Sequence, residues 1–347
     1  RLAASLLAAT ALAVAACSNA GETVVPEDGP EPEVPGDEWE TTGAEAAGLD
    51  QAVLDEIAAD AEASLSNCLL VARGGRIVDE WYFRDSGPDS AQETFSASKS
   101  FTSVLMGIAA DDGAFSVQDR ASEWIPEWKG TESEQVTIEQ LLSNTSGRFQ
   151  DFETDYVEMA ARAADKTAFS VGLDQEYEPG TDWVYNNAAI QTLEAVFEAA
   201  TDSDLSDFAA NRLFGPLGMD DTSLIRDPGG NPLTFMGVQS TCRDMARFGL
   251  MALRGGQWGG DQIVSEEWMA NSTARPSQDL NAAYGWLWWL NREGVIIGGD
   301  QASGESDKGE VSRLVEGAPE DMFFALGLGG QMIAIDPGSD TVVVRLG

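Results

Sequence analysis

The spacing of apolar residues predicts a helix and then a β-hairpin at the start of the folded part. Apolar residues recur every four positions from Leu49 to Ser64, which is typical of an amphipathic helix. Two apolar runs follow, at 68–73 and 76–83, and the pair Gly74–Gly75 joins them. Strands separated by two glycines are typical of a hairpin.

The rest of the chain changes pattern twice. From about residue 118 to 275 helical periodicity and loops dominate, and strand-like runs return after Tyr284. These runs are 285–290, 322–328, 332–335 and 341–345. Strands at both ends of the chain around a helical middle predict an α/β protein of the α+β type. We expect one antiparallel sheet formed by both chain ends, flanked by helices, with a helical lobe inserted.

The first 46 residues differ from the rest in composition. Residues 1–16 are mostly small and apolar, which is typical of a secretory signal peptide and too short for a comfortable membrane span. They end in Val-Ala-Ala-Cys17, which resembles a bacterial lipobox and implies a lipid anchor on Cys17. An ordinary secretory signal with an incidental cysteine is the alternative. In either case the protein is exported, and the lipobox places it in the cell envelope, facing the periplasm or the exterior.

Proline, glycine and acidic residues dominate from 17 to 46 and predict an extended linker. The folded domain is therefore expected at 47–347.

Composition limits the possible partners and chemistry. The chain has 59 acidic and 20 basic residues among 347, a formal net charge of −39, which excludes nucleic acid as a partner because phosphate binding needs a basic surface. Histidine is absent, so no Ser-His-Asp triad and no histidine-ligated zinc can form. Any general base must be Lys, Tyr, Asp or Glu.

The segment around Ser96 and Lys99 carries candidate nucleophilic chemistry. It opens a predicted helix, and the three-residue spacing puts both side chains on one side, one turn apart. A buried lysine has a lowered pKa and can then remove the serine proton. An exposed serine with a solvated lysine is the alternative, but the other lysines, at 129, 166 and 308, lack a serine three residues earlier.

A second candidate element is Tyr185-Asn-Asn187. A Tyr-x-Asn in a loop can bring a phenol and an amide to one cavity, where a cationic lysine would favour the phenolate. A turn with a buried tyrosine is the structural alternative.

The order of several motifs resembles the penicillin-recognising serine hydrolase superfamily, in its class C β-lactamase-like branch. The pattern is similar to that of 6-aminohexanoate-dimer hydrolases and related esterases. The motifs are Ser96-x-x-Lys99, Thr137-Ile-Glu-Gln-Leu-Leu-Ser-Asn-Thr-Ser-Gly147, Pro179-Gly-Thr-x-x-x-Tyr-x-Asn187, Pro216-Leu-Gly-Met-x-x-Thr222, Ser240-Thr-Cys-Arg-Asp-Met-Ala-Arg-Phe-Gly249 and Ala325-Leu-Gly-Leu-Gly-Gly-Gln331. They extend from about residue 65 to the C-terminus, and the resemblance implies the β-lactamase/transpeptidase-like fold.

The resemblance also implies roles for single residues. Ser96 would be the acylated nucleophile and Lys99 its activator, Tyr185 would relay protons, and Asn187 would orient these groups. Whether Lys99 or Tyr185 is the base stays open. The backbone N–H groups of Ser96 and Leu328 would form the oxyanion hole.

One departure from the family pattern bears on the substrate. Many relatives carry a Lys or His where this chain has Gly327-Leu328-Gly329, and that cation helps to hold a substrate carboxylate. Without it, Gly327 and Gly329 would border a site for uncharged esters or amides. The usual histidine of the Leu-Leu-x-His-Thr-Ser-Gly run is Asn144, for which we expect a loop hydrogen bond.

Two further groups of residues are less specific. Trp286, Trp288 and Trp289 lie in a predicted strand, where Trp286 is a candidate for the acyl pocket and core packing is the alternative. Cys68 and Cys242 could form a disulfide in an exported protein or stay buried as free thiols.

The leading hypothesis is a serine hydrolase for small esters or amides, with no cofactor and no metal. A β-lactamase or D-Ala-D-Ala carboxypeptidase is the first alternative, and a catalytically inactive surface binding protein is the second. Oligomeric state stays open.

Overall fold

The computed structural model describes residues 34–299 and 310–347. The predicted signal peptide, Cys17 and the first part of the linker lie outside the described residues. The helices are α2 (Gln51–Ala63), α3 (Ser98–Asp111), α4 (Ile138–Leu142), α5 (Lys166–Val171), α6 (Asn187–Thr201), α7 (Leu205–Ala209), α8 (Gly215–Leu217), α9 (Cys242–Leu253) and α10 (Glu266–Thr273), with π-helices at Glu153–Arg162 and Ala210–Phe214. The strands are β1 (Cys68–Arg73), β2 (Arg76–Tyr82), β3 (Gln92–Glu93), β4 (Ser223–Leu224), β5 (Val238–Ser240), β6 (Gln257–Trp258), β7 (Asp261–Gln262), β8 (Trp289–Leu290), β9 (Gly294–Ile296), β10 (Glu310–Ser312), β11 (Phe323–Gly327), β12 (Gln331–Asp336) and β13 (Thr341–Leu346).

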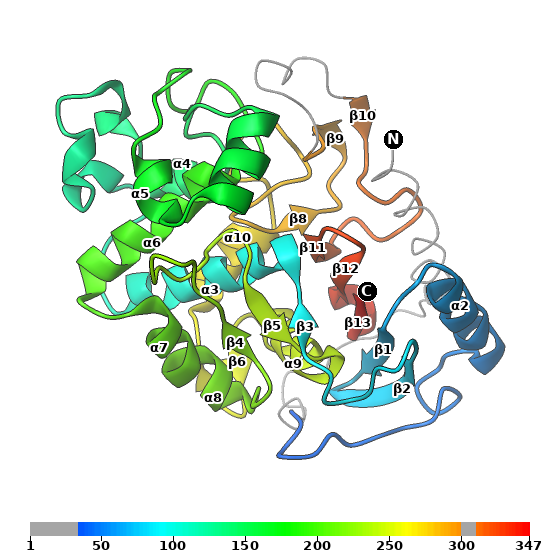
Figure 1. The fold of residues 1–347 in the computed structure, drawn as a ribbon. Helices are drawn as coiled ribbons and strands as arrows, with labels where there is room; N and C mark the ends of the chain where they lie inside the picture. The colour runs from blue at the N-terminus through cyan, green and yellow to red at the C-terminus, as the bar shows by residue number, and fades with distance from the viewer. Residues whose placement is uncertain (1–33, 300–309) are drawn as a thin grey trace.

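The main sheet has six strands in the order β2-β1-β13-β12-β11-β8, and every neighbouring pair is antiparallel. Strand β1 pairs with β13 from Cys68 opposite Leu346 to Arg73 opposite Thr341, so the two ends of the folded chain lie side by side (Figure 1). All six residues of β13 are buried, which explains its nearly continuous valine run. The predicted sheet from both chain ends, with helices inserted, is confirmed.

Helices cover both faces of this sheet. Helix α9 packs on β12 and β13 at Gly249, where a Cβ atom would come within 2.7 Å of Val342 and 2.8 Å of Ile333. Helix α2 buries Leu54 and Ala58 on the other face. Glycine at position 249 therefore lets the helix approach the strands closely.

The central helix α3 is buried on all sides. Figure 1 shows it crossing the middle of the molecule, with α4, α5 and α6 on one side. Two of its hydroxyl groups donate to the backbone of neighbouring segments: Ser100 to the Leu287 carbonyl at 2.9 Å and Thr102 to the Thr234 carbonyl at 2.7 Å. Because these polar groups are satisfied, the helix tolerates burial beyond the one apolar face that its sequence suggests.

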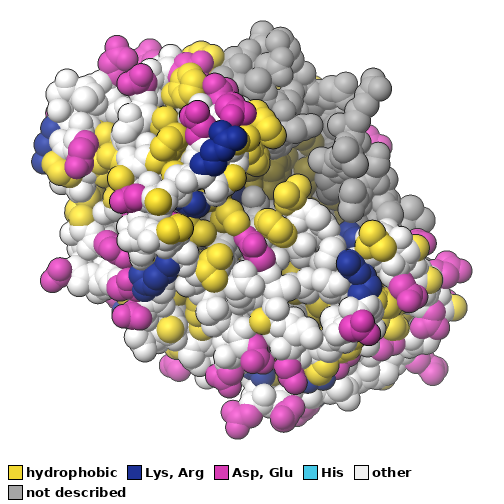
Figure 2. Space-filling model, viewed as in Figure 1, with side chains coloured by type: hydrophobic (Ala, Val, Ile, Leu, Met, Phe, Trp, Pro, Cys, Tyr) yellow, Lys and Arg dark blue, Asp and Glu magenta, His cyan; other side chains and the backbone are white. Residues whose placement is uncertain are grey.

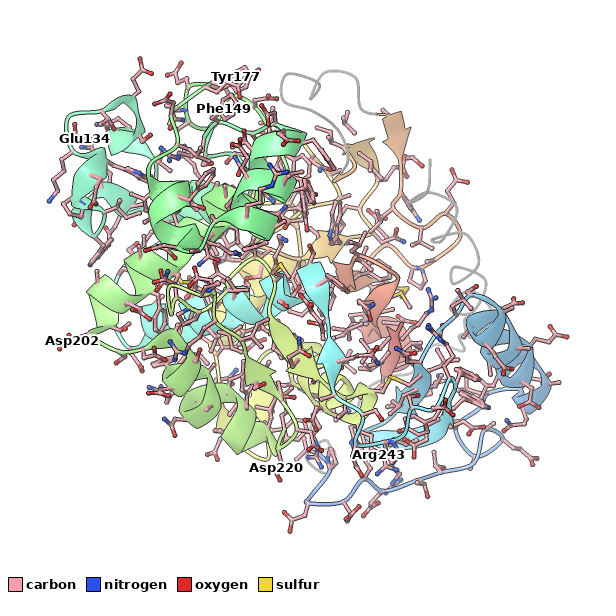
Figure 3. All side chains as sticks on the ribbon, viewed as in Figure 1. Glu134, Phe149, Tyr177, Asp202, Asp220 and Arg243 are labelled. Carbon is pink, nitrogen blue, oxygen red and sulfur yellow. A yellow bond between two sulfur atoms is a disulfide. The ribbon has the colours of Figure 1, made fainter. Side chains whose placement is uncertain are left out.

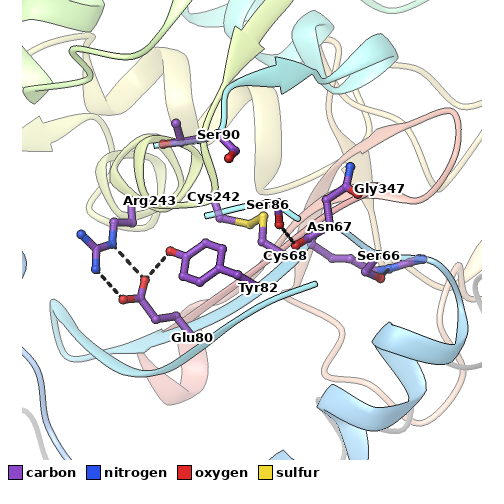
Figure 4. The surroundings of a disulfide bond; sticks show 12 residues. Ser66, Asn67, Cys68, Glu80, Tyr82, Ser86, Ser90, Cys242, Arg243 and Gly347 are labelled. Carbon is purple, nitrogen blue, oxygen red and sulfur yellow. Dashed lines mark hydrogen bonds and ion pairs between the residues drawn. A yellow bond between two sulfur atoms is a disulfide. The ribbon is translucent and has the colours of Figure 1, made fainter. Parts of the chain in front are cut away.

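A disulfide joins the first residue of β1, Cys68, to the first residue of α9, Cys242 (Figure 4). Their Cα atoms are 6.4 Å apart and 174 positions separate them. Next to it, Arg243, which Figure 3 labels, forms an ion pair with Glu80, and Glu80 also accepts a hydrogen bond from Tyr82 (Figure 4). The alternative of two free thiols is therefore overturned, and the cross-link ties α9 to the sheet.

The folded part begins earlier than the predicted boundary at residue 47. Buried Arg247 donates to the carbonyl oxygens of Gly36 at 2.7 Å and Asp37 at 3.1 Å, and Thr42 donates to the Ile77 carbonyl at 2.9 Å. Because a buried guanidinium needs acceptors, these contacts hold residues 34–46 on the domain. The linker prediction was wrong for this stretch.

The surface matches the composition. Figure 2 shows acidic side chains scattered over the visible face and outnumbering the basic ones. Of the helices within 34–299 and 310–347, none is long and apolar enough to cross a bilayer.

Candidate active site

Ser96 lies in a tight 3-10 turn, Phe95–Ala97, that leads directly into α3. Phe95 has a φ of +47°, a left-handed conformation that is strained for a bulky residue, while Ser96 stays partly accessible. Lys99 follows one turn later with only 2% of its surface exposed, and its Nζ lies 2.9 Å from Ser96 Oγ. The predicted pairing of this serine and lysine is present in the structure.

Two more oxygens surround the amine of Lys99. Nζ donates to Asn187 Oδ1 at 2.7 Å and to the carbonyl of Phe235 at 2.8 Å. A neutral amine has two N–H groups and one lone pair, and these two oxygens use both N–H groups. The lone pair of neutral Lys99 therefore points at Ser96 Oγ, which is the geometry for removing its proton.

Electrostatics favour the neutral amine. Burial lowers the pKa of Lys99 to about 7, although the charge of Asp155 acts in the opposite direction. Since the oxygens of Asn187 and Phe235 carry no formal charge, they stabilise the ammonium less than a carboxylate would. Lys99 is thus half neutral near pH 7.

Tyr185 lies beside the same two groups. The Nζ of Lys99 is 4.8 Å from the centre of the Tyr185 ring, and the phenol hydrogen-bonds with Ser96. Burial raises the pKa of Tyr185 well above its usual value, and the hydrogen bond with Ser96 offsets this only in part. Burial thus acts against the phenolate that a nearby cationic lysine was expected to favour.

Asn187 begins α6 and connects Lys99 to a carboxylate that the sequence analysis missed. Its Nδ2 donates to Asp155 Oδ2 at 2.7 Å, while its Oδ1 accepts from Lys99. Asp155 lies in the π-helix Glu153–Arg162 and is 1% exposed. Its four-residue spacing to the fully buried Met159 was the only signal, and in a chain with 59 acidic residues that signal is weak.

The end of β11 lies against the turn that holds Ser96. A Cβ atom on Gly327 would lie 3.1 Å from the Ala97 nitrogen and would clash with the Thr94 carbonyl oxygen. Leu328 follows with 72% of its surface exposed, and Gly329 has a φ of +81° in the turn to β12. The candidate oxyanion strand is therefore next to Ser96.

Of the tryptophans in the predicted strand 285–290, Trp289 and not Trp286 contacts Tyr185. Trp286 packs on Trp268 of α10 with ring centres 4.9 Å apart, whereas Trp289 stacks on Tyr185 at 5.9 Å. Leu287 has a φ of +61°, so the predicted strand 285–290 is shortened to β8. The side chains therefore do not alternate as expected, and the assignment of Trp286 to the acyl pocket was wrong.

Asn144 has the expected loop role. Its Oδ1 accepts from the Asn186 N–H at 3.3 Å and its carbonyl accepts from the Val184 N–H at 3.0 Å, so it holds the segment before Tyr185. Within the part of the chain that the structure describes, no group of three or more Cys, Asp or Glu residues could hold a metal ion.

This arrangement agrees with the comparisons with known proteins. The profile of the family described as Beta-lactamase matches residues 54–346. The chain belongs to this family. It is accordingly a serine hydrolase of the β-lactamase fold, in a family whose members hydrolyse amide or ester bonds.

Two curated members of the family show the range of its relatives. The chain is 25% identical over 313 residues to a 6-aminohexanoate-dimer hydrolase of Paenarthrobacter ureafaciens, covering 82% of this chain and 73% of the relative. It is 27% identical over 169 residues to Penicillin-binding protein 4* of Bacillus subtilis (strain 168), covering 44% of this chain and 37% of that protein.

Solved structures support the fold. A putative β-lactamase from Bacteroides dorei DSM 17855 matches with a TM-score of 0.69 and 20% identity, over 86% of this chain and 90% of that one. A putative 6-aminohexanoate-dimer hydrolase from Bacillus anthracis matches with a TM-score of 0.66 and 21% identity, over 81% and 73%.

Proposed function

We propose that this enzyme hydrolyses small uncharged esters or amides through an acyl-enzyme on Ser96. The observation that carries the proposal is the position of Lys99 Nζ, 2.9 Å from Ser96 Oγ and held by two other oxygens. Neutral Lys99 takes the proton of Ser96 as Oγ attacks the substrate carbonyl. The Tyr185 hydroxyl, which is protonated at the start of the step, gives its proton to the departing alcohol or amine and takes a replacement from the Lys99 ammonium, so that Lys99 is neutral again when the acyl-enzyme has formed.

The oxyanion hole in this proposal uses the N–H groups of Ser96 and Leu328. The approach of Gly327 to the turn at Thr94 and Ala97 supports it, because it brings the end of β11 beside the nucleophile. Two such donors stabilise the tetrahedral intermediate, and removing one typically costs about 3 kcal/mol. Water then attacks the acyl-enzyme and releases Ser96.

The preference for uncharged substrates is supported by the side chains near the site. Gly327, Leu328 and Gly329 supply no cation. Arg345 lies close to Gly330 but is 4% exposed and donates to Ser66 Oγ at 2.6 Å, so its guanidinium is used within the fold. On the other side, Trp289 presents an aromatic surface to Tyr185.

Turnover of p-nitrophenyl butyrate and of nitrocefin, together with fluorophosphonate labelling, tests the proposal. We expect hydrolysis of the butyrate ester, and a covalent label that Ser96→Ala abolishes. Ser98→Ala is the matched control, because Ser98 Oγ is buried and bonded to Thr94 and the Val238 N–H, and it should keep the label. Strong nitrocefin turnover with negligible esterase activity would favour a β-lactamase or D-Ala-D-Ala carboxypeptidase. A chain that takes no label would be an inactive binding protein.

We further propose that the protein is exported and held in the cell envelope by a lipid on Cys17. The disulfide between Cys68 and Cys242 supports export, because such bonds persist in oxidising compartments. Metabolic labelling with palmitate tests the anchor: the wild type should incorporate label and Cys17→Ala should not.

A further inference from the structure

The proposed reaction leaves the buried carboxyl group of Asp155, next to Asn187, without a role. Asp155 is 1% exposed and lies in a ten-residue π-helix, a rare form of backbone that occurs often at functional sites. Its Oδ2 accepts from Asn187 Nδ2 at 2.7 Å and from the Asn187 N–H at 3.2 Å, and its Oδ1 accepts from the Ala188 N–H at 2.7 Å.

The surroundings of Asp155 favour its ionised form. All three groups that contact its oxygens are donors, so a carboxylic acid proton would have no acceptor among them. The two backbone N–H groups also belong to the first turn of α6, where the helix dipole favours negative charge. Burial raises the pKa of Asp155, and these hydrogen bonds and the charge of Lys99 oppose that rise.

This carboxylate determines which way the amide of Asn187 points. A carboxylate accepts only N–H groups, so Nδ2 must face Asp155 and Oδ1 must face Lys99 Nζ. If the amide were reversed, two donors would meet at Lys99 and two acceptors at Asp155. The Phe235 carbonyl takes the second N–H of the amine, which leaves its lone pair for Ser96.

We propose that Asp155 is a positioning residue of the acylation step, which orients the Asn187 amide and thereby directs the Lys99 amine at Ser96. The inference rests on the proposed function, because it assigns Asp155 a task only if Lys99 acts as the base. The same carboxylate also contributes charge. Among residues 34–299 and 310–347, two ionisable groups lie next to the Lys99 amine or its amide partner, namely Asp155 from the π-helix and Tyr185 from the loop before α6. Of these, Asp155 favours the ammonium form of Lys99 and so limits how far burial lowers the pKa of Lys99.

The pH dependence of kcat/KM for p-nitrophenyl butyrate tests this role in Asp155→Asn. The negative charge of Asp155 raises the pKa of Lys99, so this pKa falls when the carboxylate is removed. We therefore expect kcat/KM of Asp155→Asn to rise at a pH about one unit lower than in the wild type. The maximal kcat/KM should fall about tenfold to a hundredfold, because the amide of Asn187 can reverse and misdirect the amine. Asp155→Glu keeps the charge, so we expect its kcat/KM to rise at the wild-type pH, but with a reduced kcat.

Asp244→Asn is the matched control. Asp244 is also buried and accepts from Thr222 Oγ1 at 2.8 Å and the Asp221 N–H at 3.1 Å, away from Lys99. In this variant we expect both the pH at which kcat/KM rises and the maximal kcat/KM to stay near the wild-type values. If the wild type is active and kcat/KM of Asp155→Asn rises at the wild-type pH, Asp155 acts only as a cap of α6, and the proposal is overturned. If Asp155→Asn does not fold, Asp155→Glu decides, and a wild-type kcat there would equally overturn it. A wild type without esterase activity or label would refute the proposed function itself.

Discussion

At the scale of single residues, the reactivity assigned to Ser96 depends on a lysine that the fold has removed from water. Lys99 is 2% exposed, and the oxygens that contact its Nζ belong to a hydroxyl, an amide and a backbone carbonyl. A directly bonded carboxylate would hold the amine charged and make it useless as a base. Here the carboxylate of Asp155 acts through Asn187, so the pKa stays at about 7.

Lys99→Arg tests the requirement for a neutral amine. Arginine stays protonated at any accessible pH, so it cannot take the Ser96 proton, and kcat/KM should fall about a thousandfold. In the wild type, kcat/KM should rise with pH through about 7, as the folded-state pKa of Lys99 requires. Lys166→Arg is the control, because Lys166 is also buried and its Nζ donates to the Ala163 carbonyl, and activity should be kept there. Equal activity of both variants would remove Lys99 from the role of base.

The residues that the sequence revealed are those with unusual chemistry for their context. Ser96 and Lys99 stood out because histidine is absent and lysine is scarce, and Tyr185 and Asn187 because a motif joins them. Asp155 did not stand out, since one acid among 59 carries no signal until its burial is known. The Phe235 carbonyl could not be predicted either, because backbone groups are the same at every position.

At the scale of elements, β11 contacts the turn before α3, so the strand that precedes Leu328 lies beside the turn that holds Ser96. Gly327 ends β11, and a Cβ atom there would lie 3.1 Å from the Ala97 nitrogen. A side chain of any size would push the strand away from Ser96. The absence of a side chain at position 327 is thus a geometric condition for the site.

Gly327→Ala should therefore separate β11 from the turn. We expect a loss of about 1–3 kcal/mol in the free energy of unfolding from overpacking, and a larger effect on kcat than on KM because the oxyanion contacts act in the transition state. Thermal unfolding and steady-state kinetics measure the two effects. Gly338→Ala is the control, since its Cβ atom would meet Asp336 Oδ1 at an ordinary 3.4 Å. Wild-type kinetics in Gly327→Ala would show that β11 does not shape the site.

Elements were predictable where apolar runs are uninterrupted. The runs that became β11, β12 and β13 are continuous in the sequence and are strands in the structure. The run 285–290 failed because Leu287 adopts a φ of +61°, which most side chains disfavour and which tertiary contacts alone select. The Leu287 N–H donates to the Leu142 carbonyl at 3.0 Å, a contact across the fold that no local pattern encodes.

At the scale of the whole molecule, two long-range connections hold the chain together. Strand β1 pairs with β13 along six residues, and the disulfide ties β1 to α9. The apolar pattern predicted the pairing of β1 with β13, because strands at both ends of the chain need partners. It left the disulfide as one of two alternatives, since the distance of 6.4 Å between the two Cα atoms follows from the packing of α9 on the sheet.

The net charge of −39 destabilises the folded chain, because self-repulsion of like charges favours the expanded chain. The range of this repulsion is about 30 Å at 0.01 M salt and about 8 Å at 0.15 M, so screening removes most of its long-range part. The midpoint of thermal unfolding at neutral pH should therefore rise by a few degrees when sodium chloride is increased over this range, and potassium chloride should act equally. Sucrose at the same concentration screens no charge and should leave the midpoint unchanged, whereas a flat or falling midpoint in salt would mean that acidic residues repel each other as strongly in the unfolded chain as in the folded one.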